Sequence, residues 1–415
     1  MQEKALTRRP GFRRWFWVQW GLELAILVSW GITGGVRKVP NVAHYELAVG
    51  GFILLVLLSA CLLAKGENDA SHQSGIRQRL LIINHYGQVI FLIPTVTMML
   101  QWLIQMLLTA GVNGTVLMVG GLVLSMVMYV PISLFALGRV RALVGRILLV
   151  ILVMFNIVFT GARLTEIPHL TTAHWLVTVA NSGIVGALGF AFTMGLVMSQ
   201  WGYRLPSFGW SKTVDWRVVS VLIVSTLGYV FYNTFSTGTT WGTALTTFDF
   251  HLSVPTIDMF LNGLEPGIAE EWLFRFVVLT LLLRAFQKVS HGVFWAVLTS
   301  ALLFGLFHVP NLAVQSVSAT ASQAVTSVAI GLLWASIYLY TRAFWWPMLF
   351  HASVDALGFM SSGTQVMDSL TPFDWGQTII LIVIFSGLAI FLLTGTRGQN
   401  VHRNVLLMIG DVKHD

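Results

Sequence analysis

Long apolar runs separated by short polar segments make up most of the chain. Each run approaches the roughly 20 residues that an α-helix needs to cross a bilayer core, and there are about twelve of them. They lie near residues 15–33, 46–64, 83–108, 115–137, 145–161, 176–199, 218–236, 264–285, 291–309, 322–340, 344–362 and 376–395. The pattern predicts an all-α polytopic membrane protein, a bundle of about twelve transmembrane helices.

Composition agrees with this pattern. The 415 residues are 56% hydrophobic and 10% charged, and their mean hydropathy is +0.77, whereas about a quarter of the residues in a soluble domain are charged. The net charge of +7 does not indicate nucleic-acid binding, because the basic residues form short clusters between apolar runs, where they set membrane orientation. The expected surroundings are a lipid bilayer, with no nucleic acid as a partner.

The distribution of basic residues predicts the orientation of the chain. The N-terminal segment is basic and lacks a small-residue cleavage site, which favours an uncleaved first span that starts inside. Residues 237–256 and 363–375 contain no lysine or arginine and are expected outside. We therefore predict that both termini are cytoplasmic, in a bacterial plasma membrane, and that a helix starting near residue 264 runs inward.

Three groups of ionisable residues fall inside apolar runs, all of them after a polar linker at residues 201–217. A charge at membrane depth costs about 2.5–3.5 kcal/mol, so such residues are functional candidates. In the first group, Glu271 and Arg275 are four residues apart, which favours an ion pair on one helical face. Glu270 points about 100° away around the helix. It is left free to act.

Two histidines form the basis of the other groups. Phe304 and His308 lie one helical turn apart, and Pro310 is expected to end that helix just after His308. His351 and Asp355 are four residues apart and face the same way. Three helices of a bundle can bring such side chains to one point. Glu23, in the first span, has no matching histidines and is expected to make an interhelical contact.

At these residues the chain resembles the CAAX protease and bacteriocin-processing family of intramembrane endopeptidases. Three family motifs are present in the family's order and spacing, E-E-x-x-x-R, F-x-x-x-H and H-x-x-x-N/D. They are carried by Glu270, Glu271, Arg275, Phe304, His308, His351 and Asp355. The resemblance implies a catalytic core of about eight helices at residues 176–395, preceded by a region of about five helices at 1–175 and followed by a cytoplasmic tail at 396–415.

The resemblance also implies a mechanism and a substrate class. Glu270 would activate water with His308, while His351 and Asp355 would hold the oxyanion. Glu271, Arg275 and Phe304 would support the site. The substrate would be a peptide or protein, with lipidated and membrane-embedded ones included. Asp355 stands where some members have asparagine, and a carboxylate donates a hydrogen bond only when it is protonated.

Four alternatives are weighed against this prediction. No cofactor is expected, but zinc stays open, with His308, His351 and Asp355 or Glu270 as its ligands. The absence of H-E-x-x-H argues against the metalloprotease helix, and Ser361 and Ser362 lack an assignable base.

A transporter could use the same acids and histidines as a proton or ion relay, although its repeats usually carry matching broken helices. A catalytically silent scaffold would have no reason to contain all three motifs.

Overall fold

The structure is a computed structural model that describes residues 6–33, 50–51, 53–60, 75–367 and 370–410. The chain forms two compact units, Met1–Gly202 and Tyr203–Asp415. The division falls inside the predicted linker at residues 201–217. The family resemblance placed the start of the catalytic core at residue 176. This boundary of the core stays a prediction.

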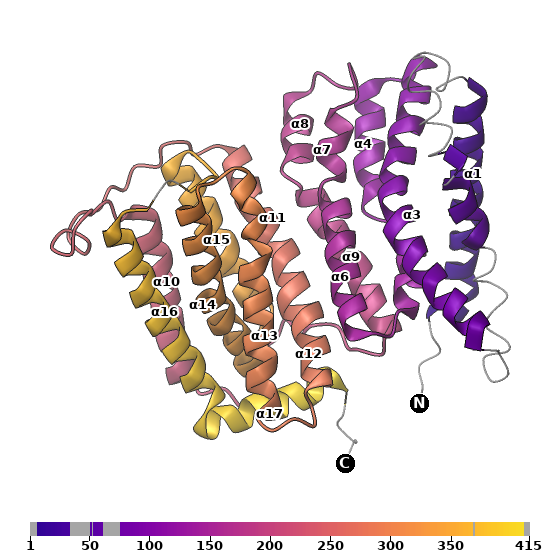
Figure 1. Cartoon of the computed structure of the whole chain (residues 1–415). Helices are drawn as coiled ribbons and strands as arrows, with labels where there is room; N and C mark the ends of the chain where they lie inside the picture. The colour runs from indigo at the N-terminus through magenta and orange to yellow at the C-terminus, as the bar shows by residue number, and fades with distance from the viewer. Residues whose placement is uncertain (1–5, 34–49, 52, 61–74, 368–369, 411–415) are drawn as a thin grey trace. The chain divides into compact units, whose positions relative to one another are not determined.

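The first unit is a bundle of helices (Figure 1). Its helices are α1 (Pro10–Thr33), the helical residues 50–51 and 53–60, α3 (Gly75–Thr109), α4 (Gly114–Ser125), α5 (Val130–Phe135), α6 (Leu143–Val158), α7 (Thr160–Thr165), α8 (His174–Asn181) and α9 (Ile184–Gln200). The buried Tyr129 hydroxyl contacts the hydroxyls of Thr97 and Thr160. These hydrogen bonds satisfy polar groups that lie within an apolar bundle.

Glu23 lies on α1. Its carboxylate accepts a hydrogen bond of 2.9 Å from Gln19, one turn earlier on the same helix. The same Gln19 amide donates to the Met128 carbonyl at 2.6 Å. Gln19 thus connects Glu23 to another segment, and an interhelical contact by Glu23 itself stays a prediction.

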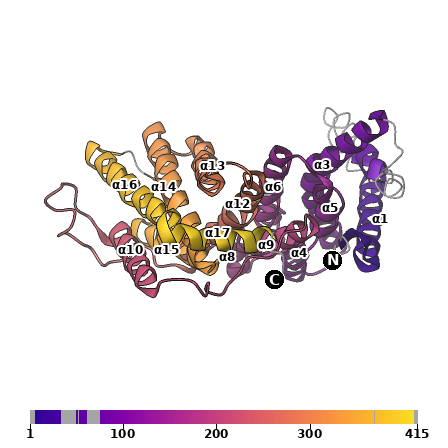
Figure 2. The ribbon, with the colours of Figure 1, turned by 90° about the horizontal axis from the view of Figure 1, so that it is seen from below.

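The second unit contains the three motifs. Its helices are α10 (Trp216–Phe235), α11 (Ile257–Glu271), the π-helix η3 (Trp272–Val278), α12 (Leu279–Ala285), α13 (Gly292–Phe307), the 3-10 helix η4 (Val309–Ala313), α14 (Val317–Thr341), α15 (Trp345–Ser362), α16 (Pro372–Leu393) and α17 (Gly395–Ile409). Helix α17 runs across one end of this unit (Figure 1), and the view from below in Figure 2 shows it crossing the ends of its neighbours α12 and α14.

The all-helical fold class is confirmed, and the described residues contain no strand beyond an isolated bridge between Ser236 and Phe248. The count of twelve spans is not confirmed. Seven described helices are long and apolar enough to cross a membrane, or eight if the bent pair α8 and α9 is one span. Helices α11, α12 and α15 are not among them. A π segment divides α11 from α12, and α11 and α15 carry the ionisable residues of the site, which lower their hydropathy.

Helix α11 also starts earlier than predicted. It begins at Ile257, because the Thr256 side chain accepts a hydrogen bond from the Met259 amide and caps the first turn. The helix therefore extends beyond the predicted span at 264–285 on its N-terminal side, and Asp258 and Asn262 interrupt the apolar pattern in this extension. Glu270 lies about 20 Å along the helix from its start, at 1.5 Å per residue.

Small residues let α11 and α15 pack closely. A Cβ atom at Gly263 would lie 2.2 Å from the Ala356 amide nitrogen, and one at Gly267 would lie 2.7 Å from the Ala352 Cβ. Two glycines four residues apart thus meet two alanines four residues apart, the small-residue packing typical of membrane helices. This contact brings the end of α11 alongside His351 on α15.

Candidate active site

Glu271 is a fully buried carboxylate at the end of α11. Its Oε2 lies 3.1 Å from Arg275 Nε, as predicted for the ion pair, and Arg275 is also buried. Its Oε1 lies 2.9 Å from His351 Nδ1. Because a carboxylate only accepts hydrogen bonds, the Nδ1 proton of His351 is donated to Glu271. Glu271 therefore connects Arg275 to the histidine of another helix, a contact that the sequence did not reveal.

Glu270 is surrounded differently from its neighbour. Its Oε2 lies 4.0 Å from His308 Nε2 and 3.8 Å from His351 Nε2. Among the described residues, this oxygen is buried without a hydrogen-bond partner. The distances exceed that of a direct hydrogen bond and are short enough for a single water molecule to contact the carboxylate and a ring nitrogen. The candidate general base and both candidate histidines thus come together.

His308 is held by the end of its helix. Helix α13 stops at Phe307, His308 is its C-cap, and the 3-10 turn that contains Pro310 follows, as predicted. His308 Nδ1 lies 2.9 Å from the Phe304 carbonyl oxygen. A carbonyl accepts hydrogen bonds, so Nδ1 carries the proton in this contact, and Nε2 of the neutral ring is left with a lone pair. That lone pair lies on the nitrogen closest to Glu270.

His351 and Asp355 form a pair on α15. Their closest atoms, Nε2 and Oδ2, are 3.4 Å apart. The His351 ring is buried, whereas the Asp355 side chain is 26% exposed. With Glu271 at Nδ1 and Asp355 at Nε2, each nitrogen of the ring faces an acceptor. When both nitrogens are protonated, both N–H bonds have partners.

Aromatic rings separate the ion pair from the rest of the bundle. The Arg275 guanidinium carbon lies 4.3 Å from the Phe304 ring centroid and 5.7 Å from that of Trp334. The same two rings contact His351, at 5.9 Å and 5.0 Å between centroids. Phe304 therefore stabilises both a cation and a histidine. Nothing in the sequence singled out Trp334.

Two further polar residues near the site were missed. Glu265, one to two turns before Glu270 on α11, interacts electrostatically with Glu270, His351 and Asp355. Tyr229 of α10 interacts in the same way with Asp355. Glu265 was visible as a further acid in the apolar run at 264–285, but it belongs to none of the three motifs. Ser361 is committed elsewhere, because its hydroxyl donates to the Thr234 carbonyl.

No metal site was identified in the described residues. Within these parts of the chain, no group of three or more His, Cys, Asp and Glu side chains has the geometry to hold a metal ion. The four residues considered as zinc ligands lie near one another: Glu270 near each histidine, and His351 near Asp355. Metal independence stays a prediction, and the chemistry argued below is derived for the side chains alone.

Comparison with known protein families gives one match. Residues 252–357 match the family described as type II CAAX prenyl endopeptidase Rce1-like. The matched segment covers α11 to most of α15 and contains all three motifs. Residues 252–357 thus form a segment of the CAAX prenyl endopeptidase type, in a chain that has several helices long and apolar enough to cross a membrane. Neither the curated proteins nor the solved structures give a match.

Proposed function

We propose that the protein is an intramembrane endopeptidase in which Glu270 activates water for attack on a peptide bond. The observation that carries this proposal is the convergence of Glu270 with two histidines from two other helices, at 4.0 Å and 3.8 Å. The adjacent acid, Glu271, is occupied by Arg275 and His351. Of the two glutamates, Glu270 is therefore the one that is not paired with Arg275 and that lies near both histidines, as suits a general base.

In the proposed reaction, a water molecule donates one hydrogen bond to Glu270 and the other to Nε2 of His308. Glu270 takes a proton as the water oxygen attacks the carbonyl carbon. The tetrahedral intermediate carries its negative charge on the former carbonyl oxygen. When the C–N bond breaks, the proton passes from Glu270 to the leaving nitrogen. The products are a carboxylic acid and an amine, so one water is consumed for each bond that breaks, and transfer of the acid's proton to the amine then gives a carboxylate and an ammonium.

We propose that His351 stabilises the oxyanion through Nε2–H. Glu271 fixes the ring by accepting from Nδ1, which leaves Nε2 to face Glu270 and the reacting carbonyl. Donors aimed at the developing charge typically contribute about 2.7–4 kcal/mol to transition-state stabilisation. Asp355, 3.4 Å from Nε2, acts by orienting this nitrogen, and in its protonated form it becomes a second donor.

The proposed substrate is a peptide or protein that reaches the site within the lipid bilayer. Lipidated and membrane-embedded substrates belong to this class. We further propose that both termini lie in the cytoplasm of a bacterial cell. The family match favours a protease over the transporter alternative.

The direct test uses purified full-length protein in proteoliposomes. A farnesylated peptide that ends in a CAAX sequence is incubated with it in water enriched in ¹⁸O, and the same peptide without the farnesyl group is incubated in parallel. Hydrolysis by activated water predicts one ¹⁸O atom in the new carboxylate of the product, detected by mass spectrometry. A faster reaction of the farnesylated peptide would support a lipidated substrate. Product without ¹⁸O would contradict the proposed water attack.

A further inference from the structure

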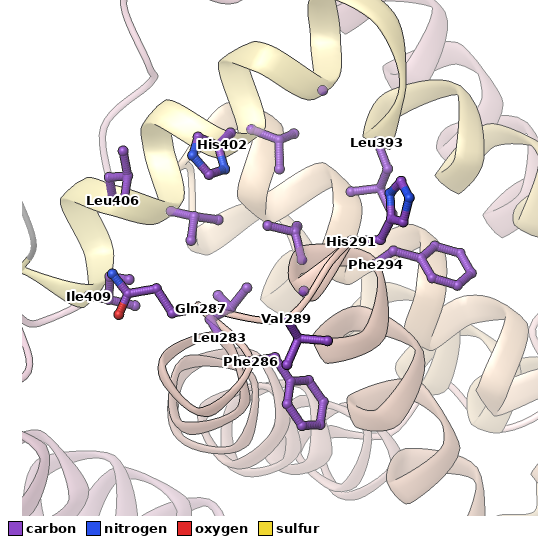
Figure 3. Close-up of a pocket in the computed structure, with 15 residues that line it drawn as sticks. Leu283, Phe286, Gln287, Val289, His291, Phe294, Leu393, His402, Leu406 and Ile409 are labelled. Atoms are coloured by element: carbon purple, nitrogen blue, oxygen red, sulfur yellow. The ribbon is translucent and has the colours of Figure 1, made fainter.

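The second unit contains a cavity of about 290 Å³ that is separate from the candidate active site. It lies between the turn that joins α12 to α13 and the C-terminal helix α17 (Figure 3). None of the site residues lines it. Its volume is at the lower end of the roughly 300–1,000 Å³ found for small-molecule sites, which is room for part of an elongated ligand.

The cavity lies at the level where candidate spans end. The span that begins at Gly292 and the span that ends at Leu393 both contribute lining residues at these termini. Helix α17 forms the remaining wall and is amphipathic: Val401, Val405 and Ile409 are buried, whereas His402 and other polar residues are exposed. A helix of this kind next to the ends of spans lies in the membrane interface.

Helix α17 is anchored firmly, so the wall that it forms is fixed. The Asn404 side chain is buried, donates to the carbonyls of Leu339 and Tyr340, and accepts from the Ser211 hydroxyl. Asn400 adds a hydrogen bond to the Thr213 carbonyl. These contacts connect α17 to the end of α14 and to the linker before α10. The cavity is therefore a built feature of the unit.

The lining combines apolar side chains with two imidazoles. Figure 3 shows His291, at the start of α13, and His402, on α17, among aliphatic and aromatic neighbours. Basic residues flank the lining positions: Lys288 lies between two of them in sequence, and Arg403 follows His402. Residues 279–300 and 395–410 contain no aspartate or glutamate. Over residues 279–300 and 395–411, the sequence thus contains four basic residues, Arg284, Lys288, Arg397 and Arg403, against one acid, Asp411.

We propose that this cavity binds an anionic phospholipid of the surrounding membrane. One acyl chain occupies the apolar lining near Leu406, and the phosphate lies between the two histidines, Lys288 and Arg403. An anionic lipid fits all three features: the apolar interior, the position at the interface, and the excess of basic residues next to the lining positions in sequence. A neutral lipid would satisfy only the first two.

The experiment measures lipid binding to delipidated, full-length protein in detergent by native mass spectrometry. Dioleoyl phosphatidylglycerol and dioleoyl phosphatidylcholine are titrated separately, because they have the same acyl chains and differ in headgroup charge. The wild-type protein should bind phosphatidylglycerol at least about tenfold more tightly. The exposed double substitution Lys288→Glu with Arg403→Glu should remove that preference. Leu406→Trp, which fills the cavity, should weaken the binding of both lipids.

The matched control is Arg217→Glu, which reverses an exposed charge in the same unit at a residue that does not line the cavity. It should leave the preference unchanged, and the unfolding temperature of each variant without lipid reports whether it is folded. Equal affinities of the wild-type protein for the two lipids would overturn the proposal. So would an equal loss of preference in the Arg217→Glu control. Binding of sn-glycerol 3-phosphate as tightly as the lipid would indicate a soluble phosphate ligand instead and would also overturn it.

Discussion

At the scale of single residues, the contrast between Glu270 and Glu271 decides the chemistry. The two acids are adjacent in sequence, yet Glu271 has a cation and an imidazole as partners, whereas Glu270 Oε2 has no hydrogen-bond partner among the described residues. A buried acid that is paired supports the structure, and a buried acid without a partner can accept a proton from water. Substitution of each acid should therefore have a different consequence.

Glu271→Gln should lower the stability of the fold. The substitution leaves the buried Arg275 without its counter-charge, and breaking one partner of a buried ion pair typically costs about 3–5 kcal/mol. Thermal unfolding of the detergent-solubilised protein measures the loss. Adding Arg275→Met to the same protein should restore most of the stability, because no uncompensated charge remains. A Glu271→Gln variant as stable as the wild-type protein would refute the structural role of this pair.

Whether the enzyme needs a metal ion also depends on individual residues. Since the proposed reaction takes its general base from Glu270 and its oxyanion donor from His351, the purified enzyme should retain its activity after prolonged chelation. Elemental analysis should find far less than one equivalent of transition metal per chain. Near-stoichiometric zinc that is lost together with activity in His308→Ala would decide for a metalloenzyme instead.

At the scale of elements, sequence spacing predicted the relationships within each helix. The pairing of Glu271 with Arg275 and the helix end at His308 follow from periodicity and from Pro310. Contacts between helices were not predictable in this way. The hydrogen bond from His351 to Glu271 joins residues 80 positions apart, and it depends on how closely two helices approach. The glycine and alanine spacing on α11 and α15 contained that information and could have been used.

The π-helix η3 is a second element that periodicity could not predict. Single π segments interrupt α-helices frequently at functional sites, where one turn is widened. Here the segment starts directly after Glu271 and contains Arg275. Its apolar residues fit a regular helix equally well, so its presence depends on tertiary packing.

Gly263→Val should disrupt the site from a distance. A Cβ at this position would lie 2.2 Å from the Ala356 amide nitrogen, so α11 and α15 must separate. We expect a lower unfolding temperature and a loss of proteolysis, because Glu270 and His351 move apart. The control is Gly228→Val on α10, where nothing lies within 4 Å of the added Cβ. Equal effects of the two substitutions would show that the close approach of α11 and α15 is unimportant.

At the scale of the whole molecule, the predicted all-helical membrane fold is confirmed, but the number of spans is not. Part of the difference concerns α11 and α15, which carry the residues of the candidate site, and α1 is also not among the candidate spans. Hydropathy identifies a span by its lack of charge, and α11 contains Asp258, Glu265, Glu270 and Glu271. Part of the predicted span at 46–64 lies outside the described residues. The acidic residues that catalysis needs thus make the helices that carry them harder to recognise as spans.

The orientation can be tested with cysteines introduced into a Cys61→Ala background. Leu245 lies in the loop at 237–256 and its side chain is 76% exposed; Lys288 lies in the turn before α13. Leu245→Cys in intact cells should react with a membrane-impermeant maleimide, and Lys288→Cys should react only after permeabilisation, as the positive-inside rule predicts. The reverse pattern would place both termini outside.

The most direct test of the proposed mechanism is the rate of peptide hydrolysis by Glu270→Gln. The amide has nearly the same shape as the carboxylate but cannot take a proton from water, so the turnover rate should fall at least about a hundredfold while the unfolding temperature stays near that of the wild-type protein. A Glu270→Gln enzyme that is folded and cleaves its substrate at the wild-type rate would contradict the mechanism.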